Sequence, residues 1–268
     1  MSNERIRIAV SGAGGKMGRE VVKMVLGDPE LQLVAAIDPS NAGLDAGRLI
    51  GADPCGVIVT DDLELALVES HAEVMVDFTI PQTVMNNART AIRHAVRPVI
   101  GTTGFSPAEI EELDRLCQEK SIGGLVAPNF SIGAILMMKF AAQAAKYMPH
   151  VEIIEYHGDQ KLDAPSGTSI KTAELIAEAR MELKQGNPNE HETIEGARGG
   201  YYNGFRIHSV RLPGVFAQQE VVFGGHGQTL KIRHDSYERA GYMPGVNVAV
   251  KKVLNITGLV YGFEHFID

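Results

Sequence analysis

The sequence predicts an α/β protein in which a doubly wound parallel sheet forms one domain and a second α+β domain contains a mixed or antiparallel sheet. Three observations lead to this prediction. β-rich runs alternate with helical patterns over the first half of the chain, which is typical of a parallel sheet. A glycine-rich turn joins the first strand to the first helix, and three strand-like runs follow closely on one another over residues 205–235.

The first half of the chain begins with a βαβ unit. Residues 6–10 are β-rich, residues 19–26 have apolar side chains at helical spacing, and residues 31–37 read as a second strand. Further strands are expected at residues 57–60, 74–78, 96–100 and 123–127, with helices at residues 63–69, 82–94 and 113–120. This alternation favours a doubly wound sheet with helices on both faces.

The pattern changes after Asn129. Helices are expected at residues 132–147 and 168–180, a strand at 151–156, and a mobile polar loop at 184–202. The runs at residues 205–212, 217–223 and 228–235 have the spacing of an antiparallel meander, and residues 246–259 that of a helix packing back on the first domain. We therefore expect a first domain of residues 1–128 plus 240–268 and a second of residues 129–239.

The charge balance argues against polyanionic partners. The chain has 25 Lys+Arg against 33 Asp+Glu, a net charge of −8, so we expect no nucleic-acid and no membrane partner.

Cys55 and Cys117 lie far apart and outside any Cys/His cluster, so we expect neither a disulfide framework nor a metal site. The sequence shows no signal-peptide core and no uninterrupted apolar stretch of about 18 residues, and a cytoplasmic location is expected.

The turn between the first strand and helix has the composition of a phosphate-binding turn. Gly12, Gly15 and Gly18 fit a Gly-x-x-Gly-x-x-Gly spacing, and Asp38 follows about 20 residues later, just beyond the second strand. Glycines let the backbone approach a pyrophosphate, the N–H groups of the helix start hold its charge, and an acid at this distance binds a ribose 2′-OH. The first domain is therefore predicted to be a Rossmann-like dinucleotide-binding domain.

The preference between NADH and NADPH stays open at this point. Asp38 favours NADH because a carboxylate repels a 2′-phosphate, whereas Lys16 and Arg19 are placed to lean over the ribose and admit NADPH. The turns at Phe78-Thr79 and at residues 101–104 follow predicted strands, and they open onto the sheet edge where ligands bind. We expect the nicotinamide to lie against these two turns.

The densest group of chemically active side chains lies in residues 155–168. His157 follows a predicted strand and Lys161 stands four residues later, so two potential proton donors share one segment. Ser166, Gly167 and Thr168 then precede a helix. Hydroxyls and free N–H groups at a helix start form a pocket that suits a carboxylate.

Several motifs occur together in the order of a known family. They are residues 12–18, 77–79, 101–104, 127–131 with Gly133, 157–168, 207–211, and 232–234 with Arg239. In these the chain resembles the 4-hydroxy-tetrahydrodipicolinate reductases, also called dihydrodipicolinate reductases, over essentially its whole length. The run Lys-Leu-Asp-Ala-Pro-Ser-Gly-Thr at residues 161–168 is the most specific part. The resemblance implies an oxidoreductase of diaminopimelate and lysine biosynthesis that reduces a cyclic unsaturated imine dicarboxylate to tetrahydrodipicolinate with NADH or NADPH.

The resemblance also implies a role for each matching residue. His157 is expected to be the proton donor/acceptor, and Lys161 a second proton donor that contacts the substrate. Ser166, Gly167 and Thr168 are expected to hold a substrate carboxylate. The residues expected to hold the dinucleotide are Gly12, Ala13, Gly14, Gly15, Lys16, Met17, Asp38, Phe78, Gly101, Thr102, Thr103, Ala127, Pro128, Asn129 and Phe130. The resemblance further implies a homotetramer assembled through the sheet of the second domain, which is thus the substrate-binding and oligomerisation domain.

One position departs from the family pattern. Many members have His-His where this chain has His157-Gly158, and the second His contacts substrate in those members. Glycine has no imidazole to make that contact. We therefore expect a raised KM for the substrate and an unchanged type of reaction.

Alternatives remain open on the sequence alone. One is another nicotinamide-dependent oxidoreductase; an acylating semialdehyde dehydrogenase would need a nucleophilic cysteine, and neither Cys55 nor Cys117 has an evident base. The other is a non-catalytic NAD(H)-binding module on the same fold, which would need neither His157 nor Lys161.

Overall fold

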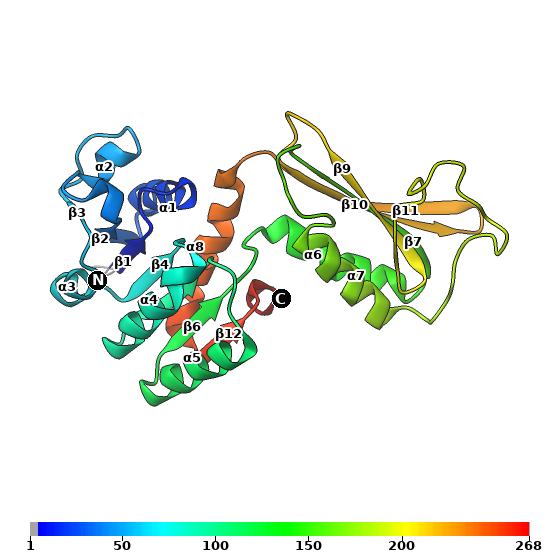
Figure 1. Cartoon of the computed structure of the whole chain (residues 1–268). Coiled ribbons are helices and arrows are strands. Elements are labelled where there is room, and N and C mark those ends of the chain that lie inside the picture. Colours follow the sequence, from blue (N-terminus) through cyan, green and yellow to red (C-terminus); the bar gives the residue numbers. More distant parts are fainter. Residues whose placement is uncertain (1–4, 268) are drawn as a thin grey trace. The chain divides into compact units, whose positions relative to one another are not determined.

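A seven-stranded sheet forms the centre of the first of two structural units. The computed structural model describes residues 5–267; the first unit comprises the described residues up to Ser131 and from Tyr242 onward, and the second comprises Ile132–Gly241. The first sheet has the order β12-β6-β5-β4-β1-β2-β3, and each pairing is parallel (Figure 1). The predicted doubly wound sheet is thereby confirmed. Its strands are β1 (Ile6–Ser11), β2 (Leu31–Ile37), β3 (Val59–Thr60), β4 (Val74–Asp77), β5 (Arg97–Ile100), β6 (Gly123–Val126) and β12 (Gly258–Tyr261).

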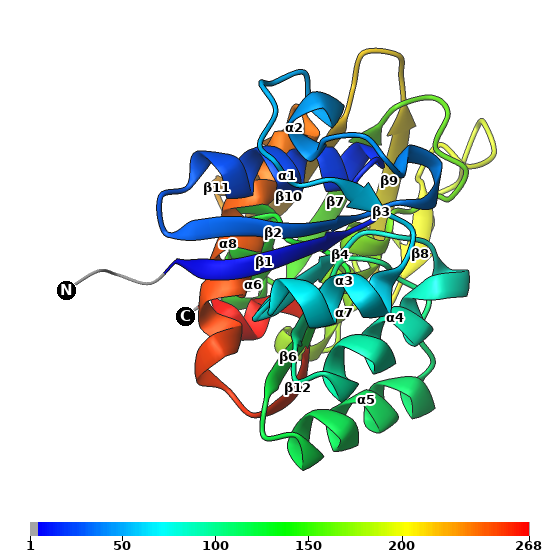
Figure 2. The same ribbon diagram turned by 90° about the vertical axis from the view of Figure 1, so that its left-hand side faces the viewer.

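Helices cover both faces of this sheet. The helices of the first unit are α1 (Lys16–Gly27), α2 (Ala46–Leu49), α3 (Leu63–Ser70), α4 (Pro81–Arg93), α5 (Pro107–Glu119) and α8 (Met243–Lys252). Figure 2 shows α3, α4 and α5 on one face and α1 and α8 on the other. The central strands are buried on both sides, which is why they read as continuous apolar runs.

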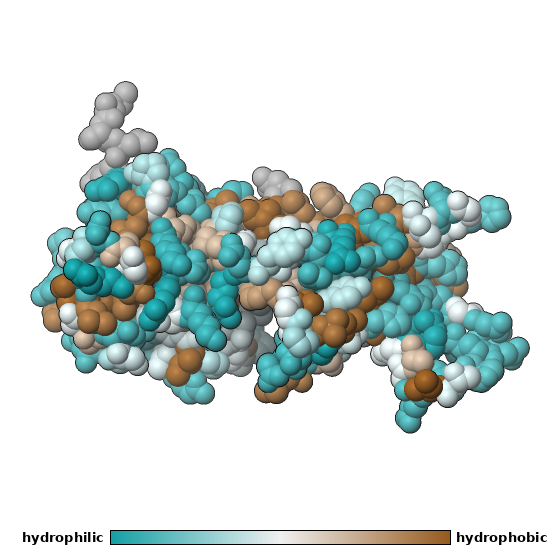
Figure 3. Space-filling model, turned by 90° about the horizontal axis from the view of Figure 1, so that it is seen from above, coloured by the Kyte–Doolittle hydropathy of each residue, from teal (hydrophilic) through white to brown (hydrophobic). Residues whose placement is uncertain are grey.

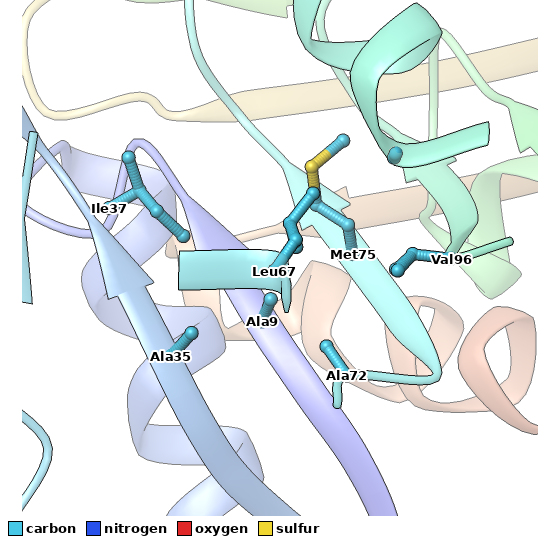
Figure 4. Packing of buried hydrophobic residues seen from close by; sticks show 8 residues of the cluster. Ala9, Ala35, Ile37, Leu67, Ala72, Met75 and Val96 are labelled. Carbon is cyan, nitrogen blue, oxygen red and sulfur yellow. The ribbon is translucent and has the colours of Figure 1, made fainter. Parts of the chain in front are cut away.

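Small and large apolar side chains fill the space between the sheet and α3. Ala9, Ala35 and Met75 come from the adjacent strands β1, β2 and β4, and they pack with Leu67 of α3 (Figure 4). These residues are at most 5% exposed. Close packing of this kind holds the strand ends in fixed relative positions, and the candidate site of this unit lies at those ends.

Helix α5 begins earlier than its apolar spacing indicated. The helix was expected over residues 113–120, and it starts at Pro107 because a capping box precedes it. Ser106 Oγ accepts a hydrogen bond from the Glu109 N–H (3.3 Å), and Glu109 Oε2 accepts one from the Ser106 N–H (2.8 Å).

The expectation of one helix over residues 246–259 is wrong at its C-terminal end. Helix α8 ends at Lys252, a single 3-10 turn spans Val253–Asn255, and the apolar residues that follow form strand β12 beside β6. Gly258 has φ of +87°, a left-handed conformation that interrupts a helix and that glycine adopts without strain. The end of the chain therefore extends the parallel sheet at its edge.

The second unit contains a five-stranded mixed sheet with two helices on it (Figure 1). Its strand order is β11-β10-β7-β9-β8, with β7 (His150–His157), β8 (Gly200–Tyr202), β9 (Phe205–Arg211), β10 (Ala217–Gly225) and β11 (Gln228–Ser236). Helices α6 (Ile132–Ala145) and α7 (Gly167–Ala179) pack together beside the sheet. This confirms the predicted α+β unit with a mixed or antiparallel sheet.

The expected three-strand meander exists only for β10 and β11. Strand β9 pairs in parallel with β7, on the side opposite β10, so the chain crosses from one side of β7 to the other between residues 211 and 217. Strand β7 is thus the centre of the sheet. This arrangement places His157 opposite Ala217 on one neighbour and Arg211 on the other.

The surface alternates between polar and apolar residues. Figure 3 shows small brown patches separated by hydrophilic, teal residues over the face in view. Within residues 5–267, none of the helices has the length and apolar character needed to cross a membrane.

Candidate active site and cofactor cradle

The turn after β1 leaves no room for side chains at three of its glycines. A Cβ on Gly12 would lie 2.6 Å from the Phe78 carbonyl oxygen, and one on Gly18 would lie 1.9 Å from the Gly12 carbonyl oxygen. A Cβ on Gly14 would lie 2.1 Å from Asn41 Nδ2. Gly12 also has φ of +78°. Helix α1 therefore approaches β1 closely, and the bare turn is accessible to a ligand's phosphates.

The start of helix α1 offers backbone N–H groups to an anion. Gly15 is the N-cap and makes no side-chain hydrogen bond to the helix, and the first turn contains no acidic residue. The first N–H groups of the helix, at Lys16 and Met17, have no intrahelical acceptor. Their partial positive charge suits a pyrophosphate, so the cradle fits a dinucleotide cofactor.

Asp38 lies beside this turn, at the end of β2. Its Oδ2 accepts a hydrogen bond from the Gly14 N–H (2.9 Å), and its Oδ1 accepts from the Ser40 N–H (3.0 Å) and from Asn41 Nδ2 (2.8 Å). The carboxylate is thus anchored where the acid of a dinucleotide site binds a ribose.

A buried aspartate organises the neighbouring strand ends. Asp77 at the end of β4 is 0% exposed; its Oδ1 accepts from Thr79 Oγ1 (2.7 Å) and Thr102 Oγ1 (3.0 Å), and its Oδ2 accepts from Asn87 Nδ2 (2.9 Å). These bonds join the turns after β4 and β5 to helix α4. The two turns that we expected beside the nicotinamide are therefore held as one surface.

Aromatic packing continues this surface toward the turn after β6. The Phe78 ring covers Gly101, where an added Cβ would lie 2.0 Å from Phe78 Cε1. The ring centroids of Phe78 and Phe130 are 5.8 Å apart, and Asn129 Oδ1 accepts the Ser131 N–H (2.8 Å). The expected dinucleotide residues thus come from the carboxyl ends of strands of one parallel sheet, which lie along one edge.

In the second unit, Ser166 caps helix α7. Its Oγ accepts the Ser169 N–H (3.3 Å) and lies 3.0 Å from Ser169 Oγ, which donates to Gln219 Oε1 (2.7 Å). Ser166 is buried, so its hydroxyl serves this network. Gly167 opens the helix, and a Cβ there would meet no atom within 4 Å. Open space at the positive end of a helix suits a carboxylate.

His157 is held by a buried carboxylate on its own strand. The ring Nδ1 contacts Glu155 Oε2, and Glu155 is 0% exposed whereas the His157 side chain is 18% exposed. Burial alone would raise the pKa of Glu155, but hydrogen bonds from His157, Arg211 and Ser209 outweigh it and lower the pKa to about 2. With Nδ1 occupied, Nε2 is the ring nitrogen left to face a ligand.

Lys161 is linked to the same carboxylate through two residues. Its Nζ donates to Asp163 Oδ1 (2.7 Å), and this hydrogen bond is the largest cause that lowers the pKa of Asp163. Arg211 Nη2 lies 2.8 Å from the Asp163 carbonyl oxygen, to which it donates, and 2.8 Å from Glu155 Oε1. The loop after β7 is therefore tied back to strand β9.

The sequence predicted no role for Glu155, Arg211, Asp163 or Asp77, although each lies within a segment that it singled out. A signal was present for Glu155, because residues two apart on a strand share a face and Glu155 precedes His157 by two. Arg211 belongs to the matching motif at residues 207–211, but its contact with Glu155 depends on the parallel pairing of β7 with β9, which the sequence did not indicate.

Cys117 is not an activated nucleophile. Cys117 is fully buried in α5, and desolvation, with a smaller effect of Asp114, raises the pKa of its thiol to about 12. This argues against the acylating dehydrogenase considered above. Within residues 5–267, no three His, Cys, Asp or Glu side chains are grouped as a metal site would require.

The fold and the cradle define a class of protein. A Rossmann-like unit with a bare glycine turn and an aspartate beside it, joined to a unit carrying a His–Lys loop, is the architecture of a nicotinamide-dependent oxidoreductase. The family model "Dihydrodipicolinate reductase, N-terminus" matches residues 6–130, and "Dihydrodipicolinate reductase, C-terminus" matches residues 133–267. The chain belongs to the dihydrodipicolinate reductase family.

Individual relatives agree with this assignment. The chain is 55% identical to the 4-hydroxy-tetrahydrodipicolinate reductase of Desulfitobacterium hafniense, over 99% of this chain and 100% of the relative. It is 52% identical to the enzyme of the same name from Bacillus pumilus, over 100% of both chains. The structure resembles a dipicolinate-bound dihydrodipicolinate reductase from Paenisporosarcina, with a TM-score of 0.87, 48% identity, and coverage of 97% of this chain and 99% of that one.

The lowered pKa of Glu155 predicts that the free energy of unfolding depends on pH. A carboxyl whose pKa is lower in the folded than in the unfolded state stabilises the fold above the unfolded pKa, and this contribution is lost as pH falls through the folded pKa. We expect the wild type to exceed Glu155→Gln in free energy of unfolding by about 3 kcal/mol above pH 5, with the difference shrinking toward pH 2. Urea denaturation at a series of pH values measures this, and a pH-independent difference would contradict it.

Proposed function

We propose that the protein reduces the cyclic imine dicarboxylate of diaminopimelate and lysine biosynthesis to tetrahydrodipicolinate, with His157 and Lys161 as the proton-transfer groups. Its family, and the name shared by its relatives over their whole length, supply the reaction. The observation that supports the residue roles is the arrangement of His157, whose Nδ1 contacts the buried Glu155 while Nε2 stays available. The dipicolinate bound in the Paenisporosarcina enzyme is a dicarboxylate of the same class.

The cofactor is NADH or NADPH, held by the first unit. When bound it supplies the hydride, and the protein's task is to hold it and to manage protons. Gly12, Gly14 and Gly18 leave the backbone bare for the pyrophosphate, and Asp38 receives the ribose. The surface of Phe78, Gly101–Thr103 and Ala127–Phe130 is proposed to position the nicotinamide.

The second unit is proposed to hold the substrate and supply the proton. The N–H groups of Gly167 and Thr168, at the positive end of α7, hold one carboxylate, while Ser166 shapes this helix start through its capping bond. As the substrate gains electrons, negative charge develops on its conjugated system. Protonated His157, or the Lys161 ammonium, neutralises this charge by donating a proton.

The family assignment supports two further proposals about the working protein. We propose that it is a homotetramer whose copies meet through the sheet of the second unit. The outer strand β11 has side chains largely exposed along its first half, which leaves this edge available to another copy. We also propose that it acts in the cytoplasm, where its soluble substrate and cofactor are formed.

Turnover with the family's substrate tests the function directly. Protein is mixed with NADH or NADPH and the fresh condensation product of pyruvate and aspartate semialdehyde, and the loss of absorbance of the reduced nicotinamide is followed. We expect wild-type turnover and a fall of about 10²- to 10⁴-fold in kcat for His157→Ala, the range typical of general acid catalysis.

The control for this test is His94→Ala. His94 also contacts a carboxylate, that of Glu64 at 2.8 Å, but it lies at the end of α4 outside the proposed site. We expect its kcat to stay within about twofold of the wild type, as for a surface change. Absence of wild-type turnover would overturn the function, and full activity of His157→Ala would overturn only the role of His157.

Cofactor preference tests the role of Asp38. Asp38→Asn keeps the size of the side chain but removes the charge that repels a 2′-phosphate. We expect the ratio of kcat/KM for NADPH to that for NADH to rise by about tenfold, equivalent to about 1.4 kcal/mol. Asp62→Asn, which alters the N-cap of α3, should leave the ratio unchanged. An unchanged ratio in Asp38→Asn would show that this carboxylate does not face the ribose.

Gly158→His tests the effect of the missing imidazole. A Cβ on Gly158 would lie 3.3 Å from the Val215 carbonyl oxygen, so a side chain fits after a small adjustment. We expect the KM for the dicarboxylate to fall about tenfold, the value of one charge-assisted hydrogen bond, with little change in kcat. Asp159→His places an imidazole one position along the loop and should leave KM unchanged. A KM in Gly158→His equal to that of the wild type would refute the expectation.

A further inference from the structure

The buried face of strand β7 is apolar at first and carries a carboxylate just before His157. Its side chains run Val151, Ile153, Glu155 and His157, and the first three are at most 2% exposed. Two apolar residues are thus followed by a carboxylate in the same layer. Burying a carboxylate costs several kcal/mol unless cations and hydrogen bonds compensate it. An apolar residue at position 155 would avoid that cost, so the presence of Glu155 calls for an explanation in the chemistry of the neighbouring site.

The two oxygens of Glu155 contact two different cationic groups. Oε2 contacts His157 Nδ1 and Oε1 lies 2.8 Å from Arg211 Nη2. Arg211 reaches this position because β9 pairs in parallel with β7, which sets Ser209 opposite Glu155 and Arg211 opposite His157. Arg211 Nη2 also donates to the Asp163 carbonyl oxygen, and the Asp163 side chain accepts from Lys161. A continuous set of contacts therefore joins His157 to Lys161.

We propose that Glu155 is the positioning residue for His157, and that Arg211 couples it to the Lys161 loop, so that both proton-transfer groups are held by one ion pair whose carboxylate is buried. The inference rests on the proposed roles of His157 and Lys161. Glu155 does not touch the substrate; it acts by selecting the Nδ1–H form of the ring, which leaves Nε2 toward the ligand, and by stabilising the imidazolium.

The charges around the imidazole come from a small set of elements. Strand β7 contributes Glu155, strand β9 contributes Arg211, and the loop after β7 contributes Lys161 and Asp163. The positions opposite His157 and Glu155 on β10 are the neutral Ala217 and Gln219, and the α7 side chains bonded to Gln219 are the hydroxyls of Ser169 and Thr172. Glu155 contacts the ring directly, whereas the Asp163 carboxylate is paired with Lys161.

The test compares Glu155→Gln with the wild type in two measurements. In the ligand-free protein, the ring ¹⁵N signals of His157, assigned with His157→Ala, should report the Nδ1–H form in the wild type and a mixture of the two neutral forms in the variant, because a glutamine amide can accept from Nδ1 or donate to it and so selects neither form. In the turnover assay, kcat should fall by at least about tenfold, whereas the KM for the substrate should change by less than about threefold. The alkaline limb of the kcat–pH profile should also move to lower pH.

The matched control is Glu152→Gln on the same strand. Glu152 likewise lies between a histidine and an arginine, 2.7 Å from His208 Nε2 and 2.7 Å from Arg198 Nη2, but on the opposite face of β7. Its replacement should leave kcat and the alkaline limb unchanged. A general loss of folded protein would lower the apparent kcat of either variant without moving the pH profile, which separates a structural role from positioning.

A double variant keeps the test decisive if Glu155→Gln does not fold. Glu155→Gln with Arg211→Met removes both charges of the pair and leaves no uncompensated cation, which preserves folding better than removing one partner. The same direction of the NMR and pH-profile changes is expected. Unchanged His157 ring signals in a folded variant overturn the proposal. Changed ring signals with unchanged kcat and pH profile show instead that His157 is not the proton donor, which is a failure of the proposed function and not of the contact.

Discussion

Burying a carboxylate in the middle of a sheet is unfavourable unless cations meet both of its oxygens, and Glu155 of strand β7 satisfies this condition with His157 and Arg211. The requirement constrains much of the second unit. Strand β9 must pair in parallel with β7 in one register, since a shift by one residue would turn Arg211 to the other face. The loop after β7 must return toward Arg211 so that the Asp163 carbonyl accepts its second bond. The positions of His157 and Lys161 follow from these contacts.

In the first unit the main constraint is different: the backbone must come close to the phosphates of the cofactor. Gly12 and Gly18 are needed because a Cβ at either would overlap backbone atoms, and Asp77 joins two adjacent turns through hydroxyl and amide donors. The glycine turn and Asp77 both lie at the carboxyl ends of parallel strands. A parallel sheet places all those ends on one edge, so residues distant in sequence form one surface.

Much of the fold was predictable because local physics decides it. The strands of the first sheet are buried on both faces and read as apolar runs, and the helices between them show helical spacing. The errors have local causes as well. The Ser106 capping box extends α5 toward its N-terminus. Helix α8 ends at Lys252, before the expected position, and Gly258, in a left-handed conformation, is the first residue of β12. The pairing of β9 with β7 could not be predicted, because strand order depends on contacts between distant segments.

The sequence by itself determined the class of fold, the dinucleotide turn with Asp38, and the family, since these depend on residue type and spacing over short distances. It also placed His157 and Lys161 in one segment with the start of helix α7. Only the tertiary structure decided what surrounds them. The pairing of β9 with β7 brings Arg211 to Glu155, 56 positions earlier in the sequence, and the packing of the sheet buries the contact between Glu155 and His157. Electrostatic interactions act over a few ångströms of space whatever the separation in sequence, and for that reason only the tertiary structure decided which charged groups lie beside His157.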